Sequence, residues 1–209
     1  MIRILPLALL LACQSTPIPT PAGPEVGVIH VRFSISGGRS GTTSPQLQRA
    51  FFAKLKEGSD DIRQSTEIIP SNYQLGTAAY LLNAAPGRYV VVCAVTNYEG
   101  KNHFVYLPGD VIEASIVEVR PGSIVPVGSI RVSESRAWST ADELQQHFHQ
   151  RILSGPQNPN VLQQLFPKAI DHMGEYGKLS NDPKDLERTR RDVRRSLNRW
   201  GWSNWPGSS

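Results

Sequence analysis

Six arginines crowd one short stretch near the end of the chain, and guanidinium groups bind phosphates and carboxylates through paired hydrogen bonds. On a helix, four of them would share one stripe, while two would lie nearer the apolar face. Three tryptophans follow. The arginine stripe and the tryptophans together predict a surface that contacts an anion or a partner protein. The stripe consists of Arg188, Arg191, Arg195 and Arg199, the other two arginines are Arg190 and Arg194, and the tryptophans are Trp200, Trp202 and Trp205.

A second interpretation of this stretch stays open. Asp185, Glu187 and Asp192 lie in the same expected helix, so its arginines would pair with its own acids. The tryptophans would then be tucked against the rest of the protein. Both interpretations require an amphipathic helix near the end of the chain.

The remaining polar residues form no recognisable catalytic set. Ser40 lies in Gly38–Gly41, which falls short of a Gly-x-Ser-x-Gly nucleophile turn. His147 and His149 would point to different faces of a helix, and a surface pair of His147 with Glu143 is favoured over a shared cation. No phosphate loop or dinucleotide fingerprint occurs. We therefore expect no enzyme, no catalytic residue, no metal and no cofactor.

Acidic residues around Asp60 give no clearer signal. Glu57, Asp60 and Asp61 are expected to form a solvated patch. A hydrolase with paired carboxylates needs two acids in a cleft, about 5–9.5 Å apart.

Cys13 stands at a sharp change of composition. Arg3 precedes an apolar run, Ile4–Leu11, and small Ala12 precedes the cysteine. The run is shorter than the about 20 apolar residues that span a bilayer, and the chain after Cys13 is polar and rich in proline. A charged start, a short apolar run and a small residue are the features of a secretory signal. A buried apolar strand or helix is the disfavoured alternative.

Leu10-Leu11-Ala12-Cys13 resembles the lipobox of bacterial lipoproteins, position by position. The resemblance implies that residues 1–12 are a signal peptide and that Cys13 carries the lipid (palmitate among its acyl chains). Gln14, rather than Asp, implies the outer membrane. Acyl chains hold a protein at a bilayer because each buried methylene contributes about 0.8 kcal/mol.

Composition limits the other possibilities. The chain has 209 residues and a net charge of +4, which is too mild to argue for nucleic acid. With Cys13 lipidated, Cys93 has no partner for a disulfide. Cys93 lies in the apolar run Tyr89–Val95, so we expect a buried, inert thiol.

Residues 13–25 contain four prolines among serines and threonines, and they predict a tether after the lipid. Such a chain is extended, at about 3.1 Å per residue, and would lift a domain about 30 Å off the membrane.

Residues 26–133 predict an antiparallel β-sandwich of seven or eight short strands. Ile29, Val31, Phe33 and Ile35 alternate with polar residues, which indicates one buried face. Thr66–Ile69, Phe104–Leu107 and Ile130–Val132 are further strand candidates, and the fourfold spacing of Leu47, Phe51 and Leu55 favours a short helix over Gln46–Lys56.

Two Pro-Gly turns punctuate this block, at Pro86-Gly87 and Pro121-Gly122, each between β-prone runs. The stretch Pro86-Gly87-Arg88-Tyr89-Val90-Val91 is similar to a hairpin of transthyretin-like and carboxypeptidase-regulatory-like sandwiches. The resemblance implies a fold and transfers no site residue.

Residues 134–209 predict a helical C-terminal segment. A helix is expected to begin at Ser139–Glu143, and others over Val161–Leu165, Ala169–Met173 and Asp185–Trp200. In the last, Leu186, Val193, Leu197 and Trp200 form one apolar stripe.

The resulting hypothesis is a non-catalytic, lipid-anchored envelope protein of the outer membrane, acting as a binding or assembly scaffold. Its expected partners are the membrane, through the lipid, and another envelope protein or an envelope glycan or lipid. A glycan- or peptidoglycan-binding module with tryptophan platforms is the alternative. An envelope hydrolase, with a cleft joining Glu143, His147 or His172 to other polar groups, is the third possibility.

Overall fold

The computed structural model describes residues 17–36, 45–59, 61, 65–98, 100–134, 165 and 168–208. Several sequence expectations fall outside these ranges. They are the signal peptide, the lipidation of Cys13, the turn around Ser40, Asp60, the helix expected after Ser139 with Glu143, His147 and His149, and all but Leu165 of the helix expected over Val161–Leu165.

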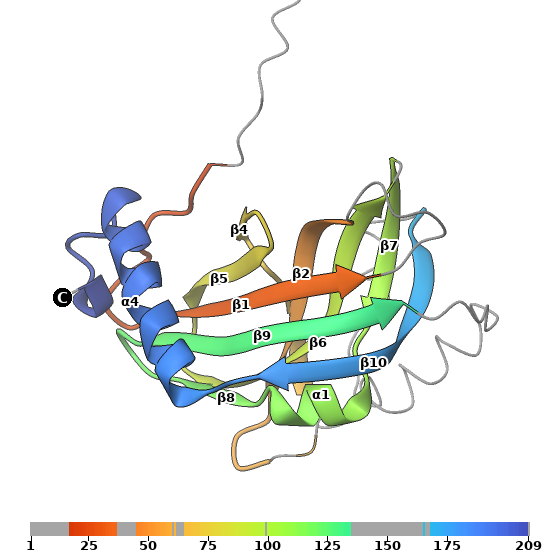
Figure 1. Ribbon diagram of the computed structural model, residues 1–209. Coiled ribbons are helices and arrows are strands. Elements are labelled where there is room, and N and C mark those ends of the chain that lie inside the picture. The colour runs from red at the N-terminus through yellow and green to blue at the C-terminus, as the bar shows by residue number, and fades with distance from the viewer. Residues whose placement is uncertain are drawn as a thin grey trace, which may run out of the picture.

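The described chain is mainly β with a C-terminal helix, as predicted (Figure 1). The strands are β1 (Gly27–Ser36), β2 (Gln46–Leu55), β3 (Ser65–Pro70), β4 (Tyr73–Leu75), β5 (Ala78–Ala84), β6 (Gly87–Tyr98), β7 (Lys101–Tyr106), β8 (Val117–Val119), β9 (Ile124–Glu134) and β10 (Ile170–Ser180). The helices are α1 (Gly109–Ala114), α4 (Pro183–Arg199) and the short 3-10 turn η2 (Pro206–Ser208).

Strand β10 joins two sheets into one continuous path. Its first residues, Ile170–Met173, run parallel to β7, and from Gly174 onward it runs antiparallel to β9, with a register shift between Gly174 and Tyr176. The strand order is β3-β2-β6-β7-β10-β9-β1-β5-β4, with β8 paired to β6. Most pairs are antiparallel, but β1 and β9 are parallel, as are β7 and the start of β10.

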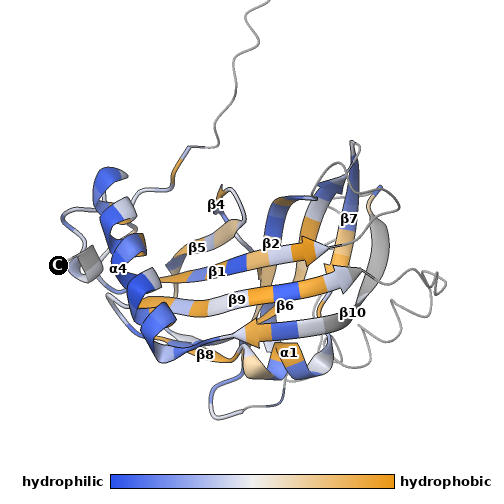
Figure 2. Ribbon diagram, viewed as in Figure 1, coloured by the Kyte–Doolittle hydropathy of each residue, from blue (hydrophilic) through white to orange (hydrophobic). Residues whose placement is uncertain are grey.

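The main core lies between the two sheets. Ile29 and Val31 of β1 meet Phe51, Phe52 and the valines of β6, all fully or almost fully buried. Helix α1 adds Val111 and Ile112 to this core. The period-two pattern predicted for β1 is therefore confirmed for its inner face (Figure 2).

Both Pro-Gly turns carry the chain from one sheet to the other. Pro86-Gly87 connects β5, which pairs with β1 and β4, to β6, which pairs with β2 and β7. The predicted turn is confirmed, but it is an arch rather than a hairpin. Tyr89 fixes this arch, because its buried ring places the hydroxyl where it donates to the Ala85 carbonyl at 2.7 Å.

The short helix expected over Gln46–Lys56 is wrong, because these residues form β2 between β3 and β6. Phe51 and Phe52 are both buried, and the register with β6 shifts between them. Such an irregularity interrupts the alternation of apolar and polar residues by which a strand is identified from sequence. The fourfold spacing of Leu47, Phe51 and Leu55, which suggested a helix, is therefore coincidental.

The helix expected over Ala169–Met173 is also wrong, because Ile170–Met173 begin strand β10. The sheet therefore takes a strand from the C-terminal segment that the sequence predicts as helical. The final helix is confirmed as α4. Asp182 caps it by accepting from the backbone N–H groups of Lys184 and Asp185, and Pro183 occupies the first turn.

Helix α4 forms a third layer on the outer face of the sheet that contains β1, β5 and β9. Its Val193 and Leu197 are buried in a second core with Val28, Leu82 and Ile124. This layer explains why His30, on the outward face of β1, is only 2% exposed.

Candidate functional site

Residues 17–26, here called the strap, lie on the folded domain. Ile18 and Val26 pack against the second core, and the Gly122 N–H donates to the Val26 carbonyl at 3.0 Å. Residues 17–25 are thus not the free, extended stalk that the sequence predicts, because their backbone and side chains have partners in the domain. This part of the strap forms no strand, and its Pro19 and Thr20 carbonyls accept hydrogen bonds from side chains of the domain.

Asn83 is the first clamp on the strap. Its Oδ1 accepts from the Ala22 N–H at 2.9 Å, and its Nδ2 donates to the Thr20 carbonyl at 2.8 Å. The backbone of Asn83 has a φ of 62°, a left-handed conformation that Asn tolerates better than most residues. This backbone conformation turns the side-chain amide toward the strap. There it accepts from one backbone N–H and donates to one backbone carbonyl, as the backbone of a neighbouring strand would.

Trp202 is the second clamp. Its indole Nε1 donates to the Pro19 carbonyl at 2.8 Å, and the side chain is fully buried. The chain reaches this position because α4 ends at Arg199, Trp200 caps it, and Gly201 follows with a φ of 86°. Trp205 is also buried, with its ring 5.2 Å from that of Trp202.

The tryptophans therefore adopt the tucked arrangement that the sequence left open. Trp202 and Trp205 present no ring face to a partner, because both lie in the second core. Trp200 is half-buried, with its ring 4.6 Å from Tyr73 and 5.4 Å from Tyr80. They hold the end of the chain, α4 and the strap together.

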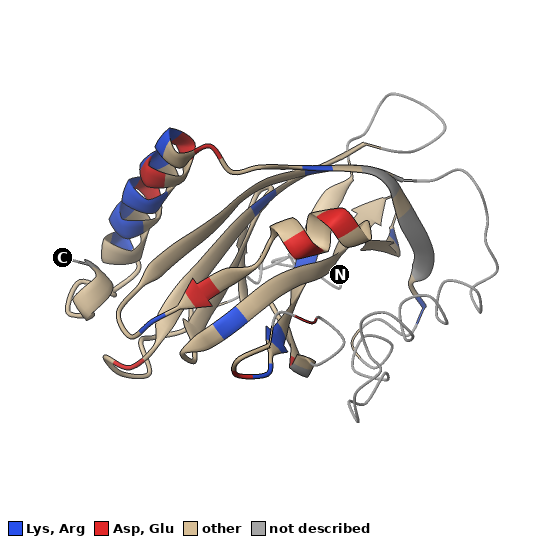
Figure 3. Ribbon diagram, turned by 90° about the horizontal axis from the view of Figure 1, so that it is seen from below, with Lys and Arg blue, Asp and Glu red and all other residues tan. Residues whose placement is uncertain are grey.

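The predicted arginine stripe is exposed. Arg188, Arg191, Arg195 and Arg199 are all exposed, on the helix that Figure 3 shows with several basic positions. Among the described residues, Arg195 lies 3.8 Å from Asp192, while Arg191 and Arg199 make no ion pair. This stripe is positioned to meet an anion, as one of the two interpretations requires.

The other two arginines serve the fold. Arg190 and Arg194 are half-buried, nearer the apolar face as predicted. Arg190 donates to the Ile124 carbonyl at 3.1 Å and pairs with Glu187, and Arg194 donates to the Gly207 carbonyl at 3.2 Å. These bonds attach α4 to β9 and to the end of the chain.

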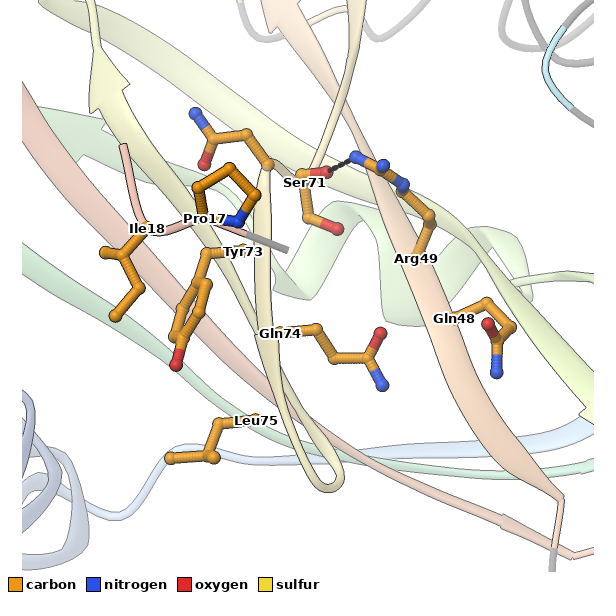
Figure 4. A pocket seen from close by; sticks show the side chains of 9 residues that line it. Pro17, Ile18, Gln48, Arg49, Ser71, Tyr73, Gln74 and Leu75 are labelled. Atoms are coloured by element: carbon orange, nitrogen blue, oxygen red, sulfur yellow. Dashed lines mark hydrogen bonds between the residues drawn. The ribbon is translucent and has the colours of Figure 1, made fainter. Parts of the chain in front are cut away.

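A polar hollow of about 600 Å³ opens beside the start of the strap (Figure 4). Arg49 is fixed there by donating to the Ser71 carbonyl at 2.5 Å, and Gln74 donates to the Leu47 carbonyl. Sequence reasoning missed this hollow, since it combines β2, β4 and the strap. Its lining residues are Pro17, Ile18, Gln48, Arg49, Ser71, Asn72, Tyr73, Gln74 and Leu75.

A smaller hollow, of about 320 Å³, lies between α4 and the sheet. His30, Arg32, Asp185, Arg188 and Asp192 contribute to its lining. Burial, and secondarily the positive charge of Arg32, lower the pKa of His30 from 6.5 to about 4. His30 is therefore neutral at pH 7, and the nearest ring to it is Tyr80, at 4.9 Å.

The structure tests the expectation for Cys93 but not the one for a hydrolase cleft at His172. Cys93 is fully buried, as predicted. Within the described ranges, no three His, Cys, Asp or Glu residues are placed to hold a metal ion. His172 lies on β10, but its side chain is outside the description, so the hydrolase cleft stays untested. No helix of the described chain has the length and apolar character needed to cross a bilayer.

Comparison with protein-family models, with curated proteins and with solved structures finds no match to this chain. Both resemblances drawn from the sequence, to lipoproteins and to transthyretin-like sandwiches, thus stay predictions.

Proposed function

We propose that this chain is a lipid-anchored protein of the cell envelope, acylated on Cys13, whose β-sandwich serves as a non-catalytic binding or assembly scaffold. The lipobox-like Leu10-Leu11-Ala12-Cys13 supports the anchor, and Gln14 favours the outer membrane. Anchoring confines the domain to a thin layer, which raises its effective concentration for partners in the same layer.

The observation that carries this proposal is the sharp division of the chain just after Cys13. The lipidation signal ends at residue 13, and the strap is already bound to the domain from Ile18 onward. A short apolar run that ends just before a lipobox-like cysteine, with a docked segment beginning a few residues later, suits a cleaved signal better than a buried element.

The scaffold role is supported by the exposed stripe of α4. Its four arginines are exposed, while Val193 and Leu197 on the apolar side are buried in the second core. In the envelope, the matching anions are lipid phosphates and acidic protein surfaces.

Fractionation of membranes tests the anchor. Cells would make the natural chain, Cys13→Ser, or the matched control Cys93→Ala, which removes the buried thiol instead. The proposal predicts that the natural chain and Cys93→Ala sediment with the outer membrane, while Cys13→Ser does not. A Cys13→Ser variant that stays in the membrane fraction at the natural level would contradict it.

Glycan binding is the second candidate, and the polar hollow now favours it more than the tryptophans do. Gln48 and Arg49 offer amide and guanidinium groups that suit sugar hydroxyls, beside an Asn72 amide that is already bonded on both sides to the Leu82 backbone. Because Trp200 packs on Tyr73 at the rim, tryptophan fluorescence should respond to soluble cell-wall fragments. A flat titration, or an equal response from Gln48→Ala, counts against this candidate.

A further inference from the structure

We propose that the anchored domain turns one fixed face to the bilayer, and that this face binds anionic lipid headgroups. The face consists of the β4–β5 turn with Leu75 and the C-terminal end of α4 with Arg195 and Arg199. The inference rests on the proposed function, because it requires acylated Cys13.

The short connection between lipid and domain limits how the domain can turn. Four residue steps separate Cys13 from Pro17, and a fully extended chain covers at most about 3.6 Å per step, or roughly 14 Å. The 12 residues of β6 alone extend over about 40 Å. A connection so much shorter than the domain cannot reach around it, so the side where the strap begins must face the membrane.

The clamps prevent the strap from lengthening this connection. Thr20 and Ala22 are bonded to Asn83, and Pro19 is bonded to Trp202. Residues 17–22 are therefore held at one place on the domain, beside the end of α4 (Figure 1).

An exposed leucine lies at this place. Leu75 ends β4, is 55% exposed, and lines the polar hollow together with Pro17 and Ile18 of the strap (Figure 4). A single exposed leucine is ordinary on a protein surface. Its position next to the origin of the tether places it where an apolar side chain can enter the headgroup region.

The positions of basic and acidic residues favour the same orientation of the domain on the membrane. Trp200 contacts Tyr73, and Tyr73 lines the hollow with Pro17, so Arg199 and the last turn of α4 lie beside the strap. The acids of α1, Asp110 and Glu113, lie on the opposite side of the domain (Figures 1 and 3). Each basic residue near an anionic bilayer strengthens binding by about fivefold, so this orientation is favoured over its reverse.

The test measures the depth of labelled positions in vesicles. Leu75→Cys and the control Glu113→Cys, each with Cys93→Ala, are made in cells, purified from membranes and labelled with an environment-sensitive fluorophore. They are placed in phosphatidylcholine vesicles with or without phosphatidylglycerol, and spin-labelled lipid is added as quencher. Thr77→Cys, on the same exposed turn, replaces Leu75→Cys if its melting curve shows a folding defect.

The orientation predicts several-fold stronger quenching at position 75 than at position 113. It also predicts that phosphatidylglycerol increases this quenching, and that Arg195→Gln with Arg199→Gln removes the increase. The mass of the N-terminal peptide from each preparation reports acylation separately. Acylated protein with equal quenching at both positions overturns the orientation and leaves the anchor intact, whereas unacylated Cys13 overturns the proposed function and this inference with it.

Discussion

Replacing Trp202 perturbs a side chain that joins the strap to the second core, in which α4 packs on the sheet. It is fully buried, lies 5.2 Å from the Trp205 ring, and donates to the Pro19 carbonyl at 2.8 Å. Trp202→Ala removes both the packing and the hydrogen bond. Trp202→Phe removes the hydrogen bond but keeps an aromatic ring and most of the packing, so the pair weighs the hydrogen bond against the packing.

The expected losses differ in size. Truncation of a buried aromatic residue to Ala lowers the free energy of unfolding by about 3–5 kcal/mol, because a cavity remains. Loss of one hydrogen bond that leaves a half-buried carbonyl without its donor costs about 1–2 kcal/mol. The Phe variant should therefore lose clearly less stability than the Ala variant.

Urea unfolding followed by far-ultraviolet circular dichroism measures both losses without relying on tryptophan emission. Hydrogen exchange at the Ala22 amide, which donates to Asn83, reports release of the strap. That exchange should become faster in Trp202→Phe and stay unchanged in Trp200→Phe, which lies at the rim and has no bond to the strap. A loss below about 1 kcal/mol for Trp202→Ala, or unchanged Ala22 exchange in Trp202→Phe, refutes the clamp.

Three further outcomes follow from the described contacts. The pKa of His30 falls from 6.5 to about 4 on folding, so the unfolded chain binds more protons than the folded one between these pH values. The free energy of unfolding should therefore drop by up to about 3 kcal/mol when the pH is lowered from 6.5 to 4. An unchanged pH profile in His30→Gln would falsify this. Gly128→Ala should cost more than about 1 kcal/mol, since its Cβ would lie 2.4 Å from a β10 carbonyl oxygen. Gly23→Ala also has a large positive φ but no atom within 4 Å of its Cβ, and equal losses would exclude the clash. Replacing the exposed residues Arg191, Arg195 and Arg199 of the stripe by serine should weaken retention of partners on the anchored protein without changing its melting curve. Equal retention would show that the stripe is not part of the binding surface.

The sequence predicts those elements whose signals are local. The alternation in β1 and the apolar stripe of α4 are read correctly, because each depends on residues a few positions apart. The Pro-Gly turns are found for the same reason. Their role as arches is not predictable from the turn itself, since it depends on which sheet each flanking strand joins.

The errors arise where distant segments decide the structure. Residues 170–173 become strand because β7 and β9 leave a place between them, which no local spacing reveals. The composition of residues 17–26 likewise does not predict that the strap is bound to the domain. Its fixed path depends on Asn83 and Trp202, which are far from it in the sequence.

Of the candidate site, the arginine stripe could be predicted and the polar hollow could not. Helical spacing alone places Arg188, Arg191, Arg195 and Arg199 on one side. The hollow requires β2 and β4 to meet the strap, and its amide side chains carry no motif. Burial of Trp202 and Trp205 could be stated only as one of two alternatives, because tryptophan is common both in cores and at interfaces.

The mass of the N-terminal peptide of the protein isolated from membranes tests the central claim most directly. The account predicts a peptide that begins at Cys13 and carries acyl chains on that residue. A peptide that retains Met1 with an unmodified Cys13 thiol would contradict the anchor, and with it the membrane-facing orientation of the domain.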